Sequence, residues 1–291
     1  MTWERFNFGD ALIYLFFIIF SASIILPFWH LLSISFSPGF VATAGGLSLW
    51  PTYFTLDNYD RVFSSRFIWM GYRNTIIRTV FGTVIQLFFT ALGAYALSKK
   101  FFPHRSMWTF LIVFTMFFSG GLIPTFMVVR NLGLIDTYAS MILPGLIGAF
   151  NLIIMRNYFM AMPEEIEESC MMDGAGRFRI FFQMVIPLAK PIIATVALWL
   201  AVGHWNAWFD VLIYITDENM FVLQIILRRI LIQGTQQMLE QTGIIGFDDN
   251  LASPAGVQAA AIYVATVPIL MVYPFIQKYF VKGIMIGSLK G

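Results

Sequence analysis

The 291-residue sequence contains little charge and a single cysteine. Only 12% of its residues are Asp, Glu, Lys or Arg, which is about half the share in an average soluble domain. Cys170 alone excludes an intrachain disulfide framework and a zinc site built on paired thiolates. His30, His104 and His204 are widely spaced and form no HExxH-type metal motif. The cysteine and histidine content therefore does not favour a metalloenzyme. The net charge of only +2 does not favour a nucleic-acid binder.

Apolar residues take the place of the missing charges. They make up 58% of the chain, including 31 Phe and 16 Met, and the mean hydropathy is +0.75. A soluble globule of this size has too little interior to bury so much apolar surface. The sequence therefore predicts an all-α integral membrane protein whose main solvent is lipid.

Charge-poor stretches long enough to cross a bilayer predict six transmembrane helices. Proline, glycine and asparagine residues separate the first of them from a long outer segment. We expect this first span to be an uncleaved helix rather than a signal peptide. The expected spans are 11–35, 72–97, 107–129, 138–158, 191–215 and 258–280.

The distribution of lysine and arginine predicts that both termini lie in the cytoplasm. More cations fall in the segments assigned to the inside than in those assigned to the outside, where Arg78 is counted. The resulting organisation is a cytoplasmic N-terminus at 1–10, the first span at 11–35, an outer loop at 36–71, a core domain of five spans at 72–280 with an inner loop at 163–187 and an outer loop at 216–257, and a cytoplasmic tail at 281–291.

The inner loop between the fourth and fifth spans is unusually acidic, with five carboxylates within ten residues. Pro163 and the glutamates after it favour a short helix over 163–172, and Gly174 can end it. A second helix is expected over 177–186, before Pro187. Like charges three and four residues apart repel each other, and a basic partner surface would remove that cost. The alternative interpretation is a solvated acidic loop.

The spacing of this loop resembles the EAA motif of bacterial ABC importer permeases. The chain reads Glu168-Ser169-Cys170-x-x-Asp173-Gly174-Ala175, followed later by Ile186-Pro187 and Pro191. Serine and cysteine replace the two alanines of the motif, and both are small enough to preserve close packing. Other segments resemble the carbohydrate-uptake permeases of this class, which are MalG-like and of the LplC/YtcP type: Asn74-Thr75, Gly93–Leu97, Gly121–Thr125, Asn131–Leu134, Leu143–Gly145 and Tyr279–Gly287.

The resemblance implies an ABC type I importer permease fold with six transmembrane helices and a cytoplasmic coupling helix. It implies a non-catalytic subunit without a cofactor of its own, and the sequence indeed has no GxxxxGK[ST] phosphate loop. ATP and Mg²⁺ would bind to a partner ATPase dimer. A second homologous permease and an extracytoplasmic solute-binding protein would complete the assembly in the bacterial cytoplasmic membrane.

In this family the first helix of the loop docks on the ATPase, so roles follow by position. Glu168 would pair with a basic ATPase residue, and Gly174 would allow a sharp reversal and close packing. Asp173 would cap the second short helix, and Pro187 would end that helix and aim the fifth span. The resemblance thus implies the coupling residues Glu164, Glu167, Glu168, Asp173, Gly174, Ala175 and Pro187.

A second candidate site lies in the fifth span, where rings and polar groups gather. Aromatic stacking combined with amides and carboxylates suits sugars, and an acid at membrane depth usually faces protein or water. The alternative is an interfacial tryptophan belt with Asp210 at its outer edge. Asn74 and Gln86 are more typical of helix packing than of sugar binding. The residues expected along a substrate path are His204, Trp205, Asn206, Trp208 and Asp210.

The sequence therefore predicts the permease subunit of an ATP-driven importer of oligosaccharides, including polysaccharide fragments with uronic acids. Closure of the ATPase would drive alternating access through the coupling loop. An ABC permease for amino acids or anions is the first alternative, because the loop alone does not distinguish solutes. A membrane-embedded transferase would need acids and histidines gathered at one membrane face, and an ion-coupled transporter would need intramembrane acids, so both are disfavoured.

Overall fold

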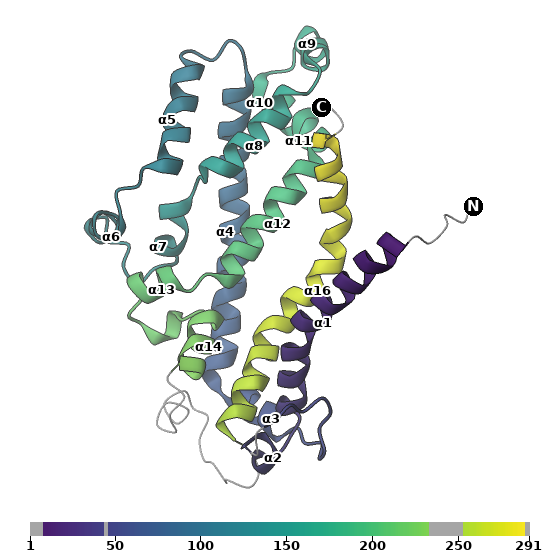
Figure 1. Ribbon diagram of the computed structural model, residues 1–291. Coiled ribbons are helices and arrows are strands. Elements are labelled where there is room, and N and C mark those ends of the chain that lie inside the picture. Colours follow the sequence, from purple (N-terminus) through teal and green to yellow (C-terminus); the bar gives the residue numbers. More distant parts are fainter. Residues whose placement is uncertain (1–7, 44–45, 233–252, 289–291) are drawn as a thin grey trace. The chain divides into compact units, whose positions relative to one another are not determined.

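The computed structural model describes residues 8–43, 46–232 and 253–288, and these form helices and turns without a β-strand. The chain divides into two compact units, Met1–Trp69 with Ile226–Val267 and Met70–Ile225 with Pro268–Gly291. In chain order the helical elements (Figure 1) are α1 (Phe8–Ser35), α2 (Gly39–Thr43), α3 (Asp57–Ser64), α4 (Arg66–Ser98), α5 (Arg105–Phe117), α6 (Leu122–Asn131), α7 (Tyr138–Ile142), η1 (Leu143–Gly145), α8 (Ala149–Met160), α9 (Glu164–Met172), α10 (Arg177–Ile180), η2 (Phe181–Val185), α11 (Ile186–Leu188), α12 (Lys190–Asn206), α13 (Phe209–Tyr214), η3 (Glu218–Met220), α14 (Leu223–Ile232) and α16 (Pro254–Ser288).

In the first unit, α1 is apolar on all sides and none of its most apolar window is buried inside the chain. Such a helix is stable in lipid because its backbone hydrogen bonds are internal. Its C-terminal end is tied to the unit by Asn58 of α3, whose amide donates to the carbonyls of Ser35 and Ser37 at 3.0 and 2.9 Å. The Tyr263 hydroxyl of α16 donates to the Phe28 carbonyl, and the first half of α16 lies alongside α1 (Figure 1).

Among the described residues, α1, α4 and residues 254–271 of α16 are long and apolar enough to cross a membrane. Three bent helix pairs also qualify and raise the number to six if each is one span. The bend is 114° between α5 and α6, 55° between α7–η1 and α8, and 83° between the α10–α11 segment and α12. The all-α architecture with up to six spans agrees with the expected fold class.

These bends occur at or beside glycine and proline residues. The expected continuous helix 107–129 is divided because Gly121 has a φ of +86°, in the left-handed region that favours glycine. Pro144 lies in the 3₁₀ turn that separates α7 from α8, and Pro191 lies in the first turn of α12. Proline removes a backbone donor, so a helix ends or changes direction beside it.

Two other expected boundaries differ from the structure. The outer segment 36–71 contains α2 and α3, and α4 already begins at Arg66. The expected span 191–215 is not one helix, because α12 ends at Asn206 and the extended residue Ala207 separates it from α13. The carbonyl that this break frees is bound by a side chain of α4, as described below.

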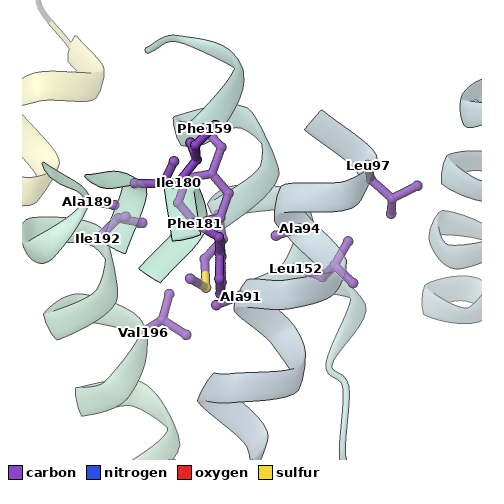
Figure 2. Packing of buried hydrophobic residues seen from close by; sticks show 12 residues of the cluster. Ala91, Ala94, Leu97, Leu152, Phe159, Ile180, Phe181, Ala189, Ile192 and Val196 are labelled. Carbon is purple, nitrogen blue, oxygen red and sulfur yellow. The ribbon is translucent and has the colours of Figure 1, made fainter. Parts of the chain in front are cut away.

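The core of the second unit joins α4, α8 and the segment from α10 to α12. Phe181 is buried at its centre with 1% of its surface exposed. Figure 2 shows the side chains of Phe159, Ile180 and Phe181 gathered together. Cys170 and Ala175 pack against the same cluster, so the inner loop is attached directly to the transmembrane core. The buried members are Ala91, Ala94, Leu97, Leu152, Met155, Phe159, Ile180, Phe181, Val185, Ala189, Ile192 and Val196.

The Asn74-Thr75 pair fastens a loop of the second unit to α4. The buried Asn74 amide donates to the carbonyls of Asn219 and Phe221 at 2.8 and 2.9 Å. The Thr75 hydroxyl accepts the Leu223 N–H at 2.8 Å. These hydrogen bonds satisfy backbone groups that would otherwise be buried without a partner, which is a packing role.

Candidate functional site

The acidic inner loop folds as two helical segments joined by a tight reversal. The Gly174 N–H donates to the Met171 carbonyl and the Ala175 N–H donates to the Cys170 carbonyl, both at 3.0 Å. Gly174 has a φ of +78°. This pattern is a Schellman motif, which ends a helix with a left-handed residue and an apolar contact beside it. The reversal therefore depends on the glycine.

Two faces of α9 differ in exposure. Ile166, Glu167 and Cys170 are partly buried, whereas Glu168 is exposed and Met172 is 88% exposed. Within the described part of the chain, the Glu168 carboxylate has no hydrogen bond or ion pair. The exposed face of α9 therefore combines acidic and apolar side chains and is open to a partner.

The partly buried face of α9 is joined to the end of α4 by charge. The Glu167 carboxylate forms an ion pair with Lys99 and accepts the Tyr95 hydroxyl at 3.2 Å. The Lys99 ammonium also lies 4.4 Å from the centre of the Tyr95 ring. Lys100 and Glu164 form a second ion pair at 2.7 Å, and this hydrogen-bonded ammonium lowers the pKa of Glu164. Glu167 therefore holds α9 within the chain and does not lie on its exposed face.

Three expected roles in this loop differ from the structure. Asp173 lies at the C-terminal cap of α9, and the second segment begins after Gly176 without a side-chain cap. A side chain at Gly174 would meet nothing within 4 Å, so the glycine serves the backbone conformation and not close packing in this chain. Pro187 does not end its helix, because α11 continues to Leu188. Since proline leaves an earlier carbonyl without a donor, the turn before it widens to the π-helical η2.

A cavity of about 430 Å³ lies in the second unit beside the break between α12 and α13. Its wall combines aromatic rings, neutral hydrogen-bonding groups and two charged side chains. The lining residues are Arg78, Gln86, Ser140, Met141, Pro144, Gly145, Trp199, Leu200, Gly203, His204, Ala207, Asp210 and Tyr214.

Arg78 of α4 is the centre of the polar network in this cavity and is 3% exposed. Its guanidinium forms a two-pronged ion pair with Asp210, which is 26% exposed. It also donates to the carbonyls of Ala207 and Met141 and to His204 Nδ1, each at 3.4 Å. All its N–H donors thus face acceptors. Two of these donors bind the carbonyls of Ala207 and Met141, which lie near helix breaks. Lipid could not supply hydrogen bonds to these carbonyls.

The network continues from Arg78 through His204 and Gln86. Since His204 Nδ1 accepts from Arg78, its proton lies on Nε2, which donates to Gln86 Oε1 at 3.2 Å. The Gln86 amide in turn donates to the Gly145 carbonyl at 2.7 Å. The imidazole lies directly on Gly82, where an added Cβ would be 2.5 Å from Nε2. These hydrogen bonds therefore connect α4 to the bent α7–α8 pair and to the C-terminal end of α12.

The structure brings together only part of the expected substrate path. His204 and Asp210 line the cavity, whereas Trp205, Asn206 and Trp208 are not among its lining residues. The ring centres of Trp205 and Tyr72 are 6.5 Å apart. Trp208 packs edge-on against Phe209, and 36% of the Trp208 surface is exposed. The two tryptophans thus face other surroundings than the cavity.

Sequence reasoning missed Arg78 and assigned Gln86 to helix packing. Arg78 was counted as a cation outside the membrane, although it lies within the 33-residue helix α4. A charged residue inside an apolar helix is itself a signal of a functional or paired site. Among the described residues, no group of three or more His, Cys, Asp or Glu side chains could hold a metal ion.

Comparisons with known proteins agree over most of the chain. Residues 68–286 match the family described as "Binding-protein-dependent transport system inner membrane component". The chain is 42% identical to the polygalacturonan/rhamnogalacturonan transport system permease protein YtcP of Bacillus subtilis (strain 168), covering 97% of this chain and 98% of YtcP. It is 43% identical to protein LplC of the same organism, covering 92% and 90%.

A solved structure is also similar. It is the crystal structure of a bacterial ABC transporter involved in the import of the acidic polysaccharide alginate. The TM-score is 0.87 at 34% sequence identity, covering 95% of this chain and 99% of the matched chain. A likeness over nearly the whole chain confirms the fold class expected from the sequence.

Proposed function

The chain belongs to the family of binding-protein-dependent transport system inner membrane components, and from this premise we propose that its transported solute is an oligosaccharide containing uronic acids. The chain is a permease subunit of an ABC importer, and members of this family are non-catalytic membrane subunits. The proposed substrates are fragments of acidic polysaccharide. Two relatives are named for such polymers, polygalacturonan/rhamnogalacturonan and alginate.

The observation that carries this proposal is the cavity in the second unit. Trp199 and Tyr214 contribute aromatic rings to its wall, and Gln86 and Ser140 contribute polar side chains. Rings and neutral polar groups together are the residue types that suit a sugar. At about 430 Å³ it lies within the usual range of small-molecule sites, roughly 300–1,000 Å³.

The proposed assembly contains an ATPase dimer that binds ATP and Mg²⁺, a second homologous permease and an extracytoplasmic solute-binding protein. The family name itself implies a binding protein, and the similar alginate importer is an ABC transporter, which supports an ATPase partner. The proposed location is the bacterial cytoplasmic membrane with both termini in the cytoplasm, where α9 faces the ATPase. The exposed face of α9 supports this, because Glu168 and Met172 combine charge and apolar surface at one position.

Uptake into ATP-loaded proteoliposomes tests the substrate. The vesicles contain the complete importer and receive either trigalacturonate or the carboxyl-reduced trisaccharide of the same linkage, with an amino-acid mixture as a third arm. Uptake of the acidic trisaccharide supports the proposal. Uptake of the amino acids alone would replace it with the first alternative.

Substitution of Glu168 tests the coupling face. We expect Glu168→Lys to reduce the amount of ATPase that copurifies with the permease pair, because a cation would face a basic groove. Glu218→Lys is the matched control, since it reverses an exposed acid in η3, at the proposed outer side. Equal ATPase retention by the two variants would remove Glu168 from the docking surface.

A further inference from the structure

The cavity beside α13 contains one guanidinium, and a carboxylate from the same chain already occupies it. Arg78 and Asp210 are the oppositely charged members of the lining. We propose that Arg78 is the subsite for a substrate carboxylate, and that Asp210 occupies this subsite when no uronic acid is bound. This inference rests on the proposed function and names the residue that would bind the carboxylate of the uronic acid.

The geometry of the pair suits such an exchange. A guanidinium presents its N–H groups as a planar fork that matches any carboxylate in a bidentate arrangement. Asp210 uses this fork with both oxygens. A uronate carboxyl has the same shape and charge, so it can make the same two hydrogen bonds without a change in Arg78.

Arg78 remains in place after Asp210 leaves. Its other donors are directed at His204 Nδ1 and at the carbonyls of Ala207 and Met141, which belong to separate elements of the cavity wall. Because these acceptors hold the guanidinium from several sides, the fork continues to face the cavity. The subsite therefore does not depend on Asp210 for its shape.

Asp210 is able to leave. Its side chain is 26% exposed and lines the cavity, whereas Arg78 at 3% exposed is almost fully buried. The Val211 N–H donates to Asp210 Oδ1 at 2.9 Å and stays available after the ion pair opens. Asp210 lies in the first turn of the six-residue α13, which begins at Phe209 shortly after the extended residue Ala207. A short helix beside a break can shift without disturbing the long helices.

The competing interpretation is that the ion pair only fastens α13 to α4. A structural clamp treats acidic and neutral sugars alike, because it affects the cavity as a whole. A carboxylate subsite makes opposite predictions for the two sugars when Asp210 loses its charge. Asp210→Asn then leaves Arg78 without its anion, so an acidic ligand should bind more tightly while a neutral one is unaffected.

Equilibrium binding to the purified complex, measured without the solute-binding protein, distinguishes the two interpretations. The probes are radiolabelled digalacturonate and digalactose of the same linkage, which differ only at the carboxyl carbon. For Asp210→Asn we expect about tenfold tighter binding of digalacturonate and a change of less than about twofold for digalactose. For the double variant Arg78→Gln/Asp210→Asn we expect digalacturonate to bind about tenfold more weakly than to the wild type.

A thermal-unfolding series with each probe keeps the test valid if Asp210→Asn is poorly stable. Digalacturonate should raise the midpoint of this variant more than that of the wild type, since ligand binding stabilises the folded state. Equal changes in affinity for the two sugars, or no binding difference between Asp210→Asn and the wild type, would overturn the subsite. If wild-type importer takes up only neutral sugars, the proposed function fails instead, and that result is independent of these variants.

Discussion

Helix α4 and the two lysines that directly follow it form ion pairs that differ in the exposure of the cation. In the Arg78–Asp210 pair the side chains are 3% and 26% exposed, whereas Lys99 and Glu167 are each 16% exposed. The neighbouring Lys100–Glu164 pair is mostly exposed, at 77% and 62%. A buried charge depends on its partner because the surroundings offer no water, while an exposed charge does not.

The difference in burial corresponds to a difference in task. Arg78 binds carbonyls freed at helix breaks, so this side chain, with or without Asp210, helps to shape the cavity wall. The Lys99–Glu167 and Lys100–Glu164 pairs attach one short helix, α9, to the end of α4. The first arrangement fixes the Arg78 guanidinium in the cavity wall, and the second offers a connection through which a movement of α9 can reach α4.

Removal of the anion from the buried pair should give the largest effect. We expect Asp210→Asn to lower the free energy of unfolding by about 3–5 kcal/mol, because Arg78 keeps a buried charge without a partner. Arg78→Gln should cost less, since the remaining Asp210 is partly exposed to water. Thermal unfolding of the purified complex without ligand measures both. Equal loss in the two variants would contradict the role given to burial.

The close contact between the His204 imidazole and Gly82 tests how much the packing of the buried network contributes to stability. Gly82→Ala should destabilise the second unit by about 1–3 kcal/mol, because the new Cβ would lie 2.5 Å from the imidazole and shift it from Arg78 and Gln86. Gly203→Ala is the stability control, since its Cβ would meet nothing within 4 Å. There we expect a small gain from helix propensity. Equal melting temperatures for both variants would show that the imidazole moves without cost.

The Lys99–Glu167 pair at the inner end should affect coupling more than stability. Glu167→Gln is expected to cost about 1 kcal/mol of unfolding free energy, less than Asp210→Asn, because the Lys99 left behind is 16% exposed whereas Arg78 is 3% exposed. It should increase ATP hydrolysis per transported solute, because α9 loses a link to α4. The charge-swapped variant Glu167→Lys/Lys99→Glu should recover part of the wild-type ratio. A ratio unchanged in Glu167→Gln would assign the link to folding alone.

The fold and the inner loop could be predicted from the sequence because their signals are local. Apolar length marks spans, and Gly174 in its motif marks a reversal that backbone geometry alone requires. The cavity could not, since Arg78 meets His204 and Asp210 only through tertiary packing. Consecutive residues on a helix point about 100° apart, so neighbours of His204 such as Trp205 cannot all face one cavity.

The exposed pair at the same end of α4 should give the smallest effect, and one that depends on pH. The Lys100 ammonium holds the pKa of Glu164 below its usual value of 4.5. A carboxylate with a lowered pKa in the folded state contributes stability above its unfolded pKa and loses it as the pH falls through the folded value. The small difference in melting temperature between the wild type and Lys100→Gln should therefore be present at neutral pH and disappear in acid. A difference that stays constant from pH 7 to below the pKa of Glu164 would mean that Lys100 acts through packing. The contrast between the buried Arg78–Asp210 pair and the exposed Lys100–Glu164 pair would then no longer rest on charge.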